Sequence, residues 1–297
     1  MRALILVLSI AAVAGPAWAH AAAGSTGGWT WDPWITLPLA ISLGNFAVGW
    51  RRLAGRASHS MPNLRRRALL FGVGWTVLAA ALVSPLHRAG ERSFSAHMLE
   101  HELLMLAAGP LLALAEPLAI MLWAFPAGMR RAIGRLPQAV GLDRLFRGLT
   151  DPIFATLAQA AALWLWHAPA LFDRALASDG WHVAQHLSFL VTALLFWSAM
   201  LTRRPRNPGL AALCLFVTSV VSGALGAMMA FSQSPWYRPY SELSMAPLGL
   251  SPMEDQQLAG LLMWIPGGAV HAAAALVLVA GALKSDAALP TEAPHVV

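Results

Sequence analysis

Seven apolar segments, most of them close to the length that crosses a bilayer, constrain this chain more than any other feature. A helix needs about 20 apolar residues to cross the roughly 30 Å of hydrocarbon. Charged residues make up 11% of the chain, whereas a soluble domain carries about 25%. We therefore expect an all-α polytopic membrane helix bundle. The predicted transmembrane helices are 34–50, 68–84, 96–114, 152–166, 182–201, 209–231 and 257–283.

The N-terminus has the pattern of a secretory signal peptide. One Arg precedes a short apolar stretch, and an A-x-A cleavage signal ends at Ala19. We expect cleavage there, with an uncleaved anchor as the alternative. Cleavage would leave residues 20–33 as an outer segment before a seven-span membrane domain at 34–283. It would also make His20 the first residue, and an α-amine beside an imidazole chelates a cupric ion.

The basic residues indicate the orientation of the spans. Cytoplasmic loops collect Lys and Arg, and fifteen of these residues lie in the connections on one side, against four on the other. This bias predicts an outer N-terminus, a cytoplasmic C-terminus and a disordered inner tail at 284–297. The pI near 10.9 then reflects membrane topology, so we predict a lipid bilayer and no nucleic acid as partner.

Two histidine pairs mark the predicted outer side of the membrane. His97 and His101 are spaced i and i+4, as are His182 and His186, and each pair projects from one helix face at the outer end of a span. His167 ends the preceding span at the same depth. One such pair is most often structural. Two pairs at matching depth predict a metal or haem site, because ionisable groups within a membrane are functional by default.

Copper is the metal that this set of side chains favours. Imidazole suits several transition metals, and thioether sulfur selects cuprous copper. Met105 continues the first histidine stripe, and Cys214 is the one cysteine, so a thiol pair is excluded. We expect Asp255, at the start of the last span, to fix an imidazole tautomer or bind the metal. Its alternative role is to cap its own helix. The sequence lacks an HExxH motif, and we predict no enzymatic activity.

Three blocks of sequence together resemble one family. They are HMLEHELLMLAAGPLLALAEP, WHAPALFDRAL followed by WHVAQHLSFLVTALLFW, and DQQLAGLLMWIPGG. In these blocks the chain resembles the CtaG-type assembly factors of caa-type cytochrome c oxidase, and the resemblance covers nearly all of it after the signal region. It implies a metallochaperone of the bacterial plasma (inner) membrane that helps provide copper to oxidase subunits. The residues matching the family's motifs are His97, His101, His182, His186, His167 and Asp255.

Other functions stay open at this point. A bis-His haem cytochrome also places histidines on facing helices, although pairs within one turn suit a compact ion better. A metal-free assembly scaffold would carry the same histidines as structural residues. Copper transport ranks below delivery, because His271 and Cys214 are isolated in the sequence. The sequence does not identify the copper donor protein or the oxidation state of the ion.

Overall fold

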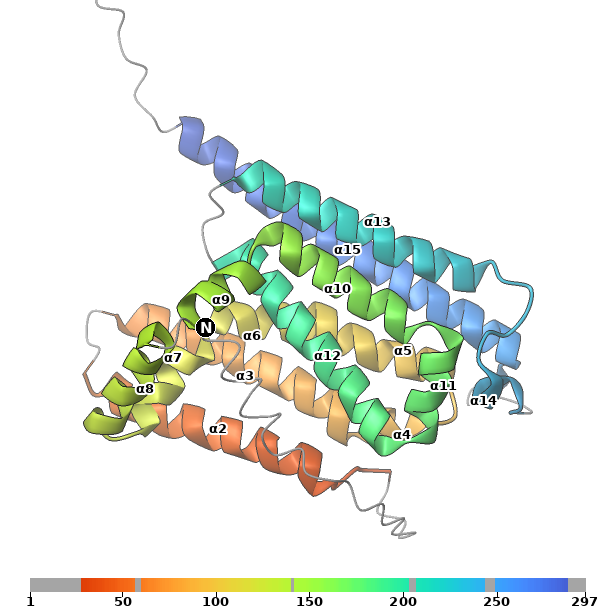
Figure 1. Ribbon diagram of the computed structural model, residues 1–297, viewed down its shortest axis with the longest axis horizontal. Coiled ribbons are helices and arrows are strands. Elements are labelled where there is room, and N and C mark those ends of the chain that lie inside the picture. Colours follow the sequence, from red (N-terminus) through yellow and green to blue (C-terminus); the bar gives the residue numbers. More distant parts are fainter. Residues whose placement is uncertain (1–27, 57–59, 140–141, 203–206, 244–248, 288–297) are drawn as a thin grey trace, which may run out of the picture.

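The computed structural model describes residues 28–56, 60–139, 142–202, 207–243 and 249–287, which form a helical bundle without a β-strand (Figure 1). The predicted signal peptide, His20 and most of the predicted inner tail lie outside these residues. The long helical segments are α2 (Pro33–Ala54), α3 (Met61–Val83), α5 (Phe94–Glu102) with η1 (Leu103–Ala108) and α6 (Gly109–Ala115), α10 (Pro152–Trp166), α12 (Asp179–Trp197) with η3 (Ser198–Thr202), α13 (Pro208–Ala230) and α15 (Pro252–Ala287).

Helices occur at all seven predicted spans. Five of them are long and apolar enough to cross a membrane, judged by length and composition. Helix α10 is apolar but has 15 residues, and α2 is not among the five. The chain is therefore a multi-pass membrane protein, whereas the count of seven spans stays a prediction. The five candidates are Met61–Val83, Phe94–Ala115, Asp179–Thr202, Pro208–Ala230 and Pro252–Lys284.

Polar residues followed by proline define where several long helices begin. Asp32, Asp151 and Asn207 each accept a hydrogen bond from a backbone N–H in the first turn of the following helix. The next residue in each case is proline, which cannot donate a backbone hydrogen bond and is preset for a helical φ. These caps define the residue at which each of these three helices begins.

The two ends of the bundle differ in composition. Helices α4 (Pro85–Gly90), α11 (Pro169–Ala177) and α14 (Arg238–Ser241) lie at one end, where α5, α12 and α15 begin. We call it the histidine end. At the opposite end lie α7 (Pro117–Met121), η2 (Leu122–Ala124), α8 (Ala127–Ala139) and α9 (Leu142–Leu149), with the arginine-rich connections (Figure 1). Among the described residues, all histidines except His271 lie at the histidine end and most arginines at the opposite end, as the predicted topology requires.

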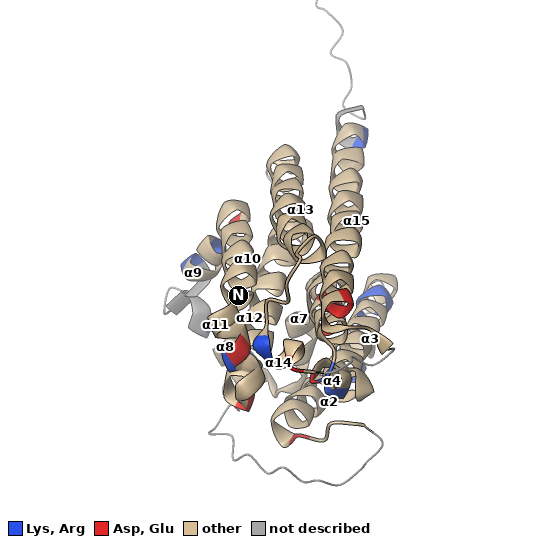
Figure 2. Ribbon diagram, turned by 90° about the vertical axis from the view of Figure 1, so that its right-hand side faces the viewer, with Lys and Arg blue, Asp and Glu red and all other residues tan. Residues whose placement is uncertain are grey.

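Helices α13 and α15 make the most extensive helix–helix contact among the described residues. A Cβ added at Gly226 would lie 2.7 Å from the carbonyl oxygen of Gly260, so the two backbones touch. Small residues allow membrane helices to approach in this way. Charged residues on α15 are confined to its two ends, and α13 has none (Figure 2). We call this pairing the α13–α15 contact.

Candidate metal centre

The two predicted histidine pairs meet inside the histidine end. Ring centroids are 4.4 Å apart within the His97–His101 pair and 4.2 Å apart within the His182–His186 pair. Between the pairs, His101 lies 5.0 Å from His186, and His97 lies 5.3 Å from His182. Three of the four side chains are buried, and His182 is partly exposed. We call these four residues the imidazole cluster; their binding of a metal stays a prediction.

Two sets of three side chains in this region have the spacing of a metal site. One nitrogen each from His97, His182 and His186 lies within 4.8 Å of the others, and so do ligand atoms of His87, Glu100 and His186. His186 belongs to both sets, so the two sets overlap. An ion could pass from one set to the other while keeping one ligand.

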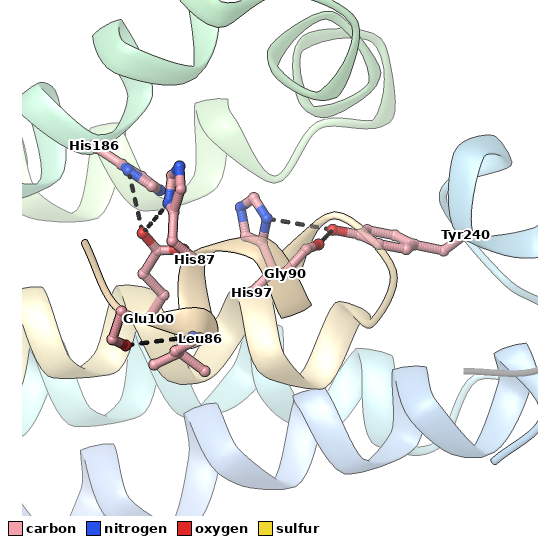
Figure 3. A network of polar contacts seen from close by, with 8 residues as sticks. Leu86, His87, Gly90, His97, Glu100, His186 and Tyr240 are labelled. Carbon is pink, nitrogen blue, oxygen red and sulfur yellow. Dashed lines mark hydrogen bonds and ion pairs between the residues drawn. The ribbon is translucent and has the colours of Figure 1, made fainter. Parts of the chain in front are cut away.

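His87 and Glu100 are site residues that the sequence-based ligand set omitted. Oε1 of Glu100 lies 2.8 Å from Nδ1 of His87 and 3.7 Å from Nδ1 of His186 (Figure 3). Glu100 is fully buried. Burial disfavours the charged form of His87, but the hydrogen bond and charge of Glu100 outweigh it and raise the pKa of His87. The carboxylate thus places negative charge beside the imidazoles, where it would stabilise a cation.

A tyrosine from α14 orients one imidazole. The Tyr240 hydroxyl donates to the carbonyl oxygen of Gly90 at 2.5 Å and lies 3.2 Å from Nδ1 of His97 (Figure 3). Since its proton is directed to the carbonyl, the hydroxyl oxygen accepts from Nδ1–H of His97. Burial raises the pKa of Tyr240, which keeps the phenol protonated. Nε2 of His97 therefore keeps its lone pair, as a metal ligand must.

His167 lies beside the imidazole cluster, next to a methionine. Its ring centroid is 6.3 Å from that of His101. Nδ1 donates to the carbonyl oxygen of Leu163 at 2.6 Å, and Nε2 lies 3.4 Å from Sδ of Met98. Burial lowers the pKa of His167 to about 4, so the ring is neutral near pH 7. His167 thus adds an imidazole with a free lone pair, and Met98 adds a thioether.

Several nitrogens of the cluster have no hydrogen-bond partner among the described residues. They are both ring nitrogens of His101 and the Nε2 atoms of His97, His182 and His186. Most buried polar groups in proteins are hydrogen-bonded, and each exception needs an explanation. A set of unpaired imidazole nitrogens beside a carboxylate and a thioether has the chemistry of a transition-metal site. The residues therefore fit a copper ion.

Asp255 supports the site without lying among the imidazoles. Its carboxylate accepts hydrogen bonds from the Ser93 hydroxyl at 2.9 Å, from N–H of Phe94 at 2.6 Å, and from Ser95. These groups form the N-terminus of α5, which carries the first histidine pair. Within the described residues no hydrogen bond joins Asp255 to an imidazole. Asp255 caps a neighbouring helix, whereas the sequence suggested an imidazole contact, a metal ligand or a cap of its own helix.

The described polar contact of Met105 lies outside the imidazole cluster. Its sulfur accepts a hydrogen bond from Nε2 of Gln159 at 3.3 Å. Residues Leu103–Ala108 form a π-helix, whose i→i+5 hydrogen bonds widen the turn. The α-helical spacing that aligned Met105 with His97 and His101 therefore breaks, and Met98 is the thioether beside the histidines.

An apolar cavity of about 160 Å³ adjoins the imidazole cluster. It lies between α2, α3 and α12, where Trp75, Leu78 and Leu190 are among its lining residues. His87 and His182 also line it, together with His186. The partly exposed side of the cluster therefore faces an apolar space within the bundle.

Comparisons with known proteins identify the family. The model of the cytochrome c oxidase caa3 assembly factor family (Caa3_CtaG) matches residues 44–285, which is most of the chain. No curated protein and no solved structure matches the chain. The matched residues contain the imidazole cluster, His87, Glu100 and Asp255. The chain therefore belongs to the family of cytochrome c oxidase caa3 assembly factors, as the sequence resemblance predicted.

Proposed function

We propose that this assembly factor binds copper through the imidazole cluster and helps to deliver it to cytochrome c oxidase. The observation that carries this proposal is the group of unpaired imidazole nitrogens buried at one point of the bundle. Membership in the family supports the oxidase as the partner. The donor set supports copper, because imidazole binds copper and thioether sulfur selects the cuprous ion.

The overlapping ligand sets suit a carrier. His97, His182 and His186 form one set, and the second set shares His186. Because the sets share a ligand, copper can be exchanged stepwise without being released into water. Glu100 supplies negative charge at the second set. We assign no catalytic role to these residues, since binding and transfer of an ion require no covalent chemistry.

The proposed site lies at the outer face of the bacterial plasma membrane. The separation of histidines and arginines between the two ends of the bundle supports this orientation, because basic residues collect on the cytoplasmic side. The proposed cleaved signal peptide agrees with an outer N-terminus. Copper centres of the oxidase that face the same side would then be within reach of the cluster.

A compact ion fits the imidazole cluster better than haem does. A bis-His haem requires two imidazoles on opposite sides of a flat porphyrin. Here His101 and His186 meet edge to face with ring centroids 5.0 Å apart, and the rings of each pair are closer still. Such contacts favour one or two small ions held among the rings.

Oxidase maturation in cells tests delivery. Cells that lack this protein would receive either the parent chain or a variant with His97, His101, His182 and His186 replaced by Gln. We expect the parent to restore copper in the assembled oxidase and the variant to leave it copper-deficient at equal membrane abundance. Glu91→Gln, an exposed acid at the same end, is the control and should behave like the parent. Full maturation with the four-Gln variant would support a metal-free scaffold and contradict copper delivery.

A further inference from the structure

A second group of polar side chains surrounds a small cavity deeper in the bundle. The cavity has a volume of about 20 Å³ and lies between η1, α10, α13 and α15. We call it the inner cavity. A space of about 10–15 Å³ on this measure holds one water-sized particle, so the inner cavity has room for one water or one ion. Its polar or sulfur-containing lining residues are Glu102, Met105, Gln159, Thr218, Ser222 and His271.

Two oxygen atoms at the inner cavity have no hydrogen-bond partner among the described residues. They are Oε2 of Glu102 and Oε1 of Gln159, and both are buried. Oε2 of Glu102 would lie 3.8 Å from a Cβ added at Gly267, so the carboxylate points toward α15. An unpaired carboxylate within a membrane-spanning segment is costly, and such residues are most often functional.

His271 presents a free lone pair to the same region. Its Nδ1 donates to the carbonyl oxygen of Gly267 at 2.7 Å, which leaves Nε2 as the unprotonated nitrogen of the neutral ring. The ring stacks on Trp197, with centroids 5.5 Å apart and planes 10° apart. The backbone bond and the stacking together fix the orientation of the imidazole. His271 therefore contributes a positioned ligand and is not an isolated histidine, as it appears in the sequence.

The side chains of Met105 and Gln159 complete the donor set. Since Nε2 of Gln159 donates to Sδ of Met105, the amide is turned so that its oxygen stays free. The inner cavity thus combines a carboxylate, a thioether, an imidazole and an amide oxygen. Thioether and imidazole are ligands for cuprous copper, and the negative carboxylate would balance the single charge of that ion.

We propose that the inner cavity is a second copper site, which binds one cuprous ion deeper in the bundle than the imidazole cluster. This inference rests on the proposed function, because the second site would take up copper that is first bound at the imidazole cluster. Met105 follows His101 by four residues along the same helical segment. Leu163 lines the inner cavity and also accepts the hydrogen bond of His167. The two sites are therefore adjacent along the bundle, and copper can move between them.

Copper stoichiometry of the full chain tests the second site. The detergent-purified protein would be loaded with cuprous ion under reducing, oxygen-free conditions, and bound copper would be measured against a competing cuprous chelator. We expect Glu102→Gln to bind one ion fewer per chain than the parent. Met105→Leu should lower the affinity for the same ion by about tenfold or more. It should also lower the signal of sulfur ligands in the X-ray absorption spectrum of the bound copper. Glu91→Gln is the matched acid-to-amide control and should bind as the parent does.

The outcomes separate this proposal from the proposed function. If Glu102→Gln and Met105→Leu both bind copper as the parent does, the second site is wrong and the imidazole cluster is unaffected. If the parent binds no copper, both proposals are contradicted. If Glu102→Gln unfolds, which its thermal unfolding curve would show, the result for Met105→Leu decides. A four-Gln variant of the imidazole cluster that still binds one ion, lost on adding Glu102→Gln, would support the second site independently.

Discussion

The imidazole cluster and the α13–α15 contact are both buried between helices, but they are built in opposite ways. At the α13–α15 contact, glycines bring two backbones together and close packing stabilises the pair. At the imidazole cluster, ring nitrogens have no hydrogen-bond partner within the described part of the chain, which costs stability. The first region is explained by packing alone. A bound copper ion, as proposed, would account for the second, and the difference would then separate structural from functional burial in this protein.

The largest expected effect comes from adding a methyl group at the α13–α15 contact. Gly226→Ala would force a Cβ to within 2.7 Å of the carbonyl oxygen of Gly260. We expect the free energy of unfolding to fall by about 3 kcal/mol, the upper range for overpacking. Gly72→Ala is the control, because a Cβ there meets nothing within 4 Å. Equal thermal stability of the two variants in detergent would show that the backbones are farther apart than described.

The cap on α5 should give the next largest effect. Asp255→Asn removes the charge that holds Ser93, Phe94 and Ser95 at the start of the helix. We expect a loss of about 2 kcal/mol in the free energy of unfolding, as for hydrogen bonds to a buried charge. Copper affinity should also fall, because α5 positions the first histidine pair. A variant that loses copper affinity while its unfolding curve is unchanged would instead make Asp255 a metal ligand.

The tyrosine that orients His97 should have a smaller effect on stability. Tyr240→Phe removes the hydrogen bonds to Gly90 and His97, at a cost of about 1 kcal/mol. We expect copper affinity to fall by about tenfold, because losing a hydrogen-bond partner that fixes the tautomer of a ligand lowers metal affinity by about this factor. The measurement is a chelator competition at constant pH. Unchanged affinity would mean that Tyr240 serves packing alone.

A substitution at His101 should have the smallest effect on stability. It also tests most sharply whether the imidazole cluster, unlike the α13–α15 contact, is buried for a reason other than packing. His101 has two buried nitrogens without partners among the described residues, so His101→Leu removes unpaired polar atoms and keeps a similar apolar volume. We expect the metal-free protein to be as stable as the parent, or more stable by about 1 kcal/mol, while copper binding weakens. A large loss of stability in the metal-free variant would show that His101 makes structural hydrogen bonds.

The fold was largely predictable, because membrane spans depend on the length of apolar segments. Helices occur at all seven predicted positions, and the caps at Asp151 and Asn207 are readable in the sequence. The π-helix at Leu103–Ala108 was not predicted, although Pro110 follows it and cannot donate a backbone hydrogen bond. Trp197 donates to the carbonyl oxygen of Met105 at 2.8 Å within that segment. The described polar contact of Met105 is with Gln159, and its role as a metal ligand stays a prediction.

The site was predictable where its residues share a helix face. The i and i+4 spacing identified His97 with His101, and His182 with His186, and the two pairs do meet. His87 has no such periodicity, since it lies on the short helix α4, whose position depends on its contacts with α5. The role of Asp255 depends on how α15 packs against α5, which no local pattern contains.

Metal content of the purified protein tests the central claim most directly. The parent would be compared, after loading with copper, with the variant that carries Gln at His97, His101, His182 and His186. We predict copper bound to the parent, a loss of the ions at the imidazole cluster in the variant, and a visible spectrum without a Soret band. A Soret band in the parent, or equal copper in both proteins, would contradict copper binding by these histidines.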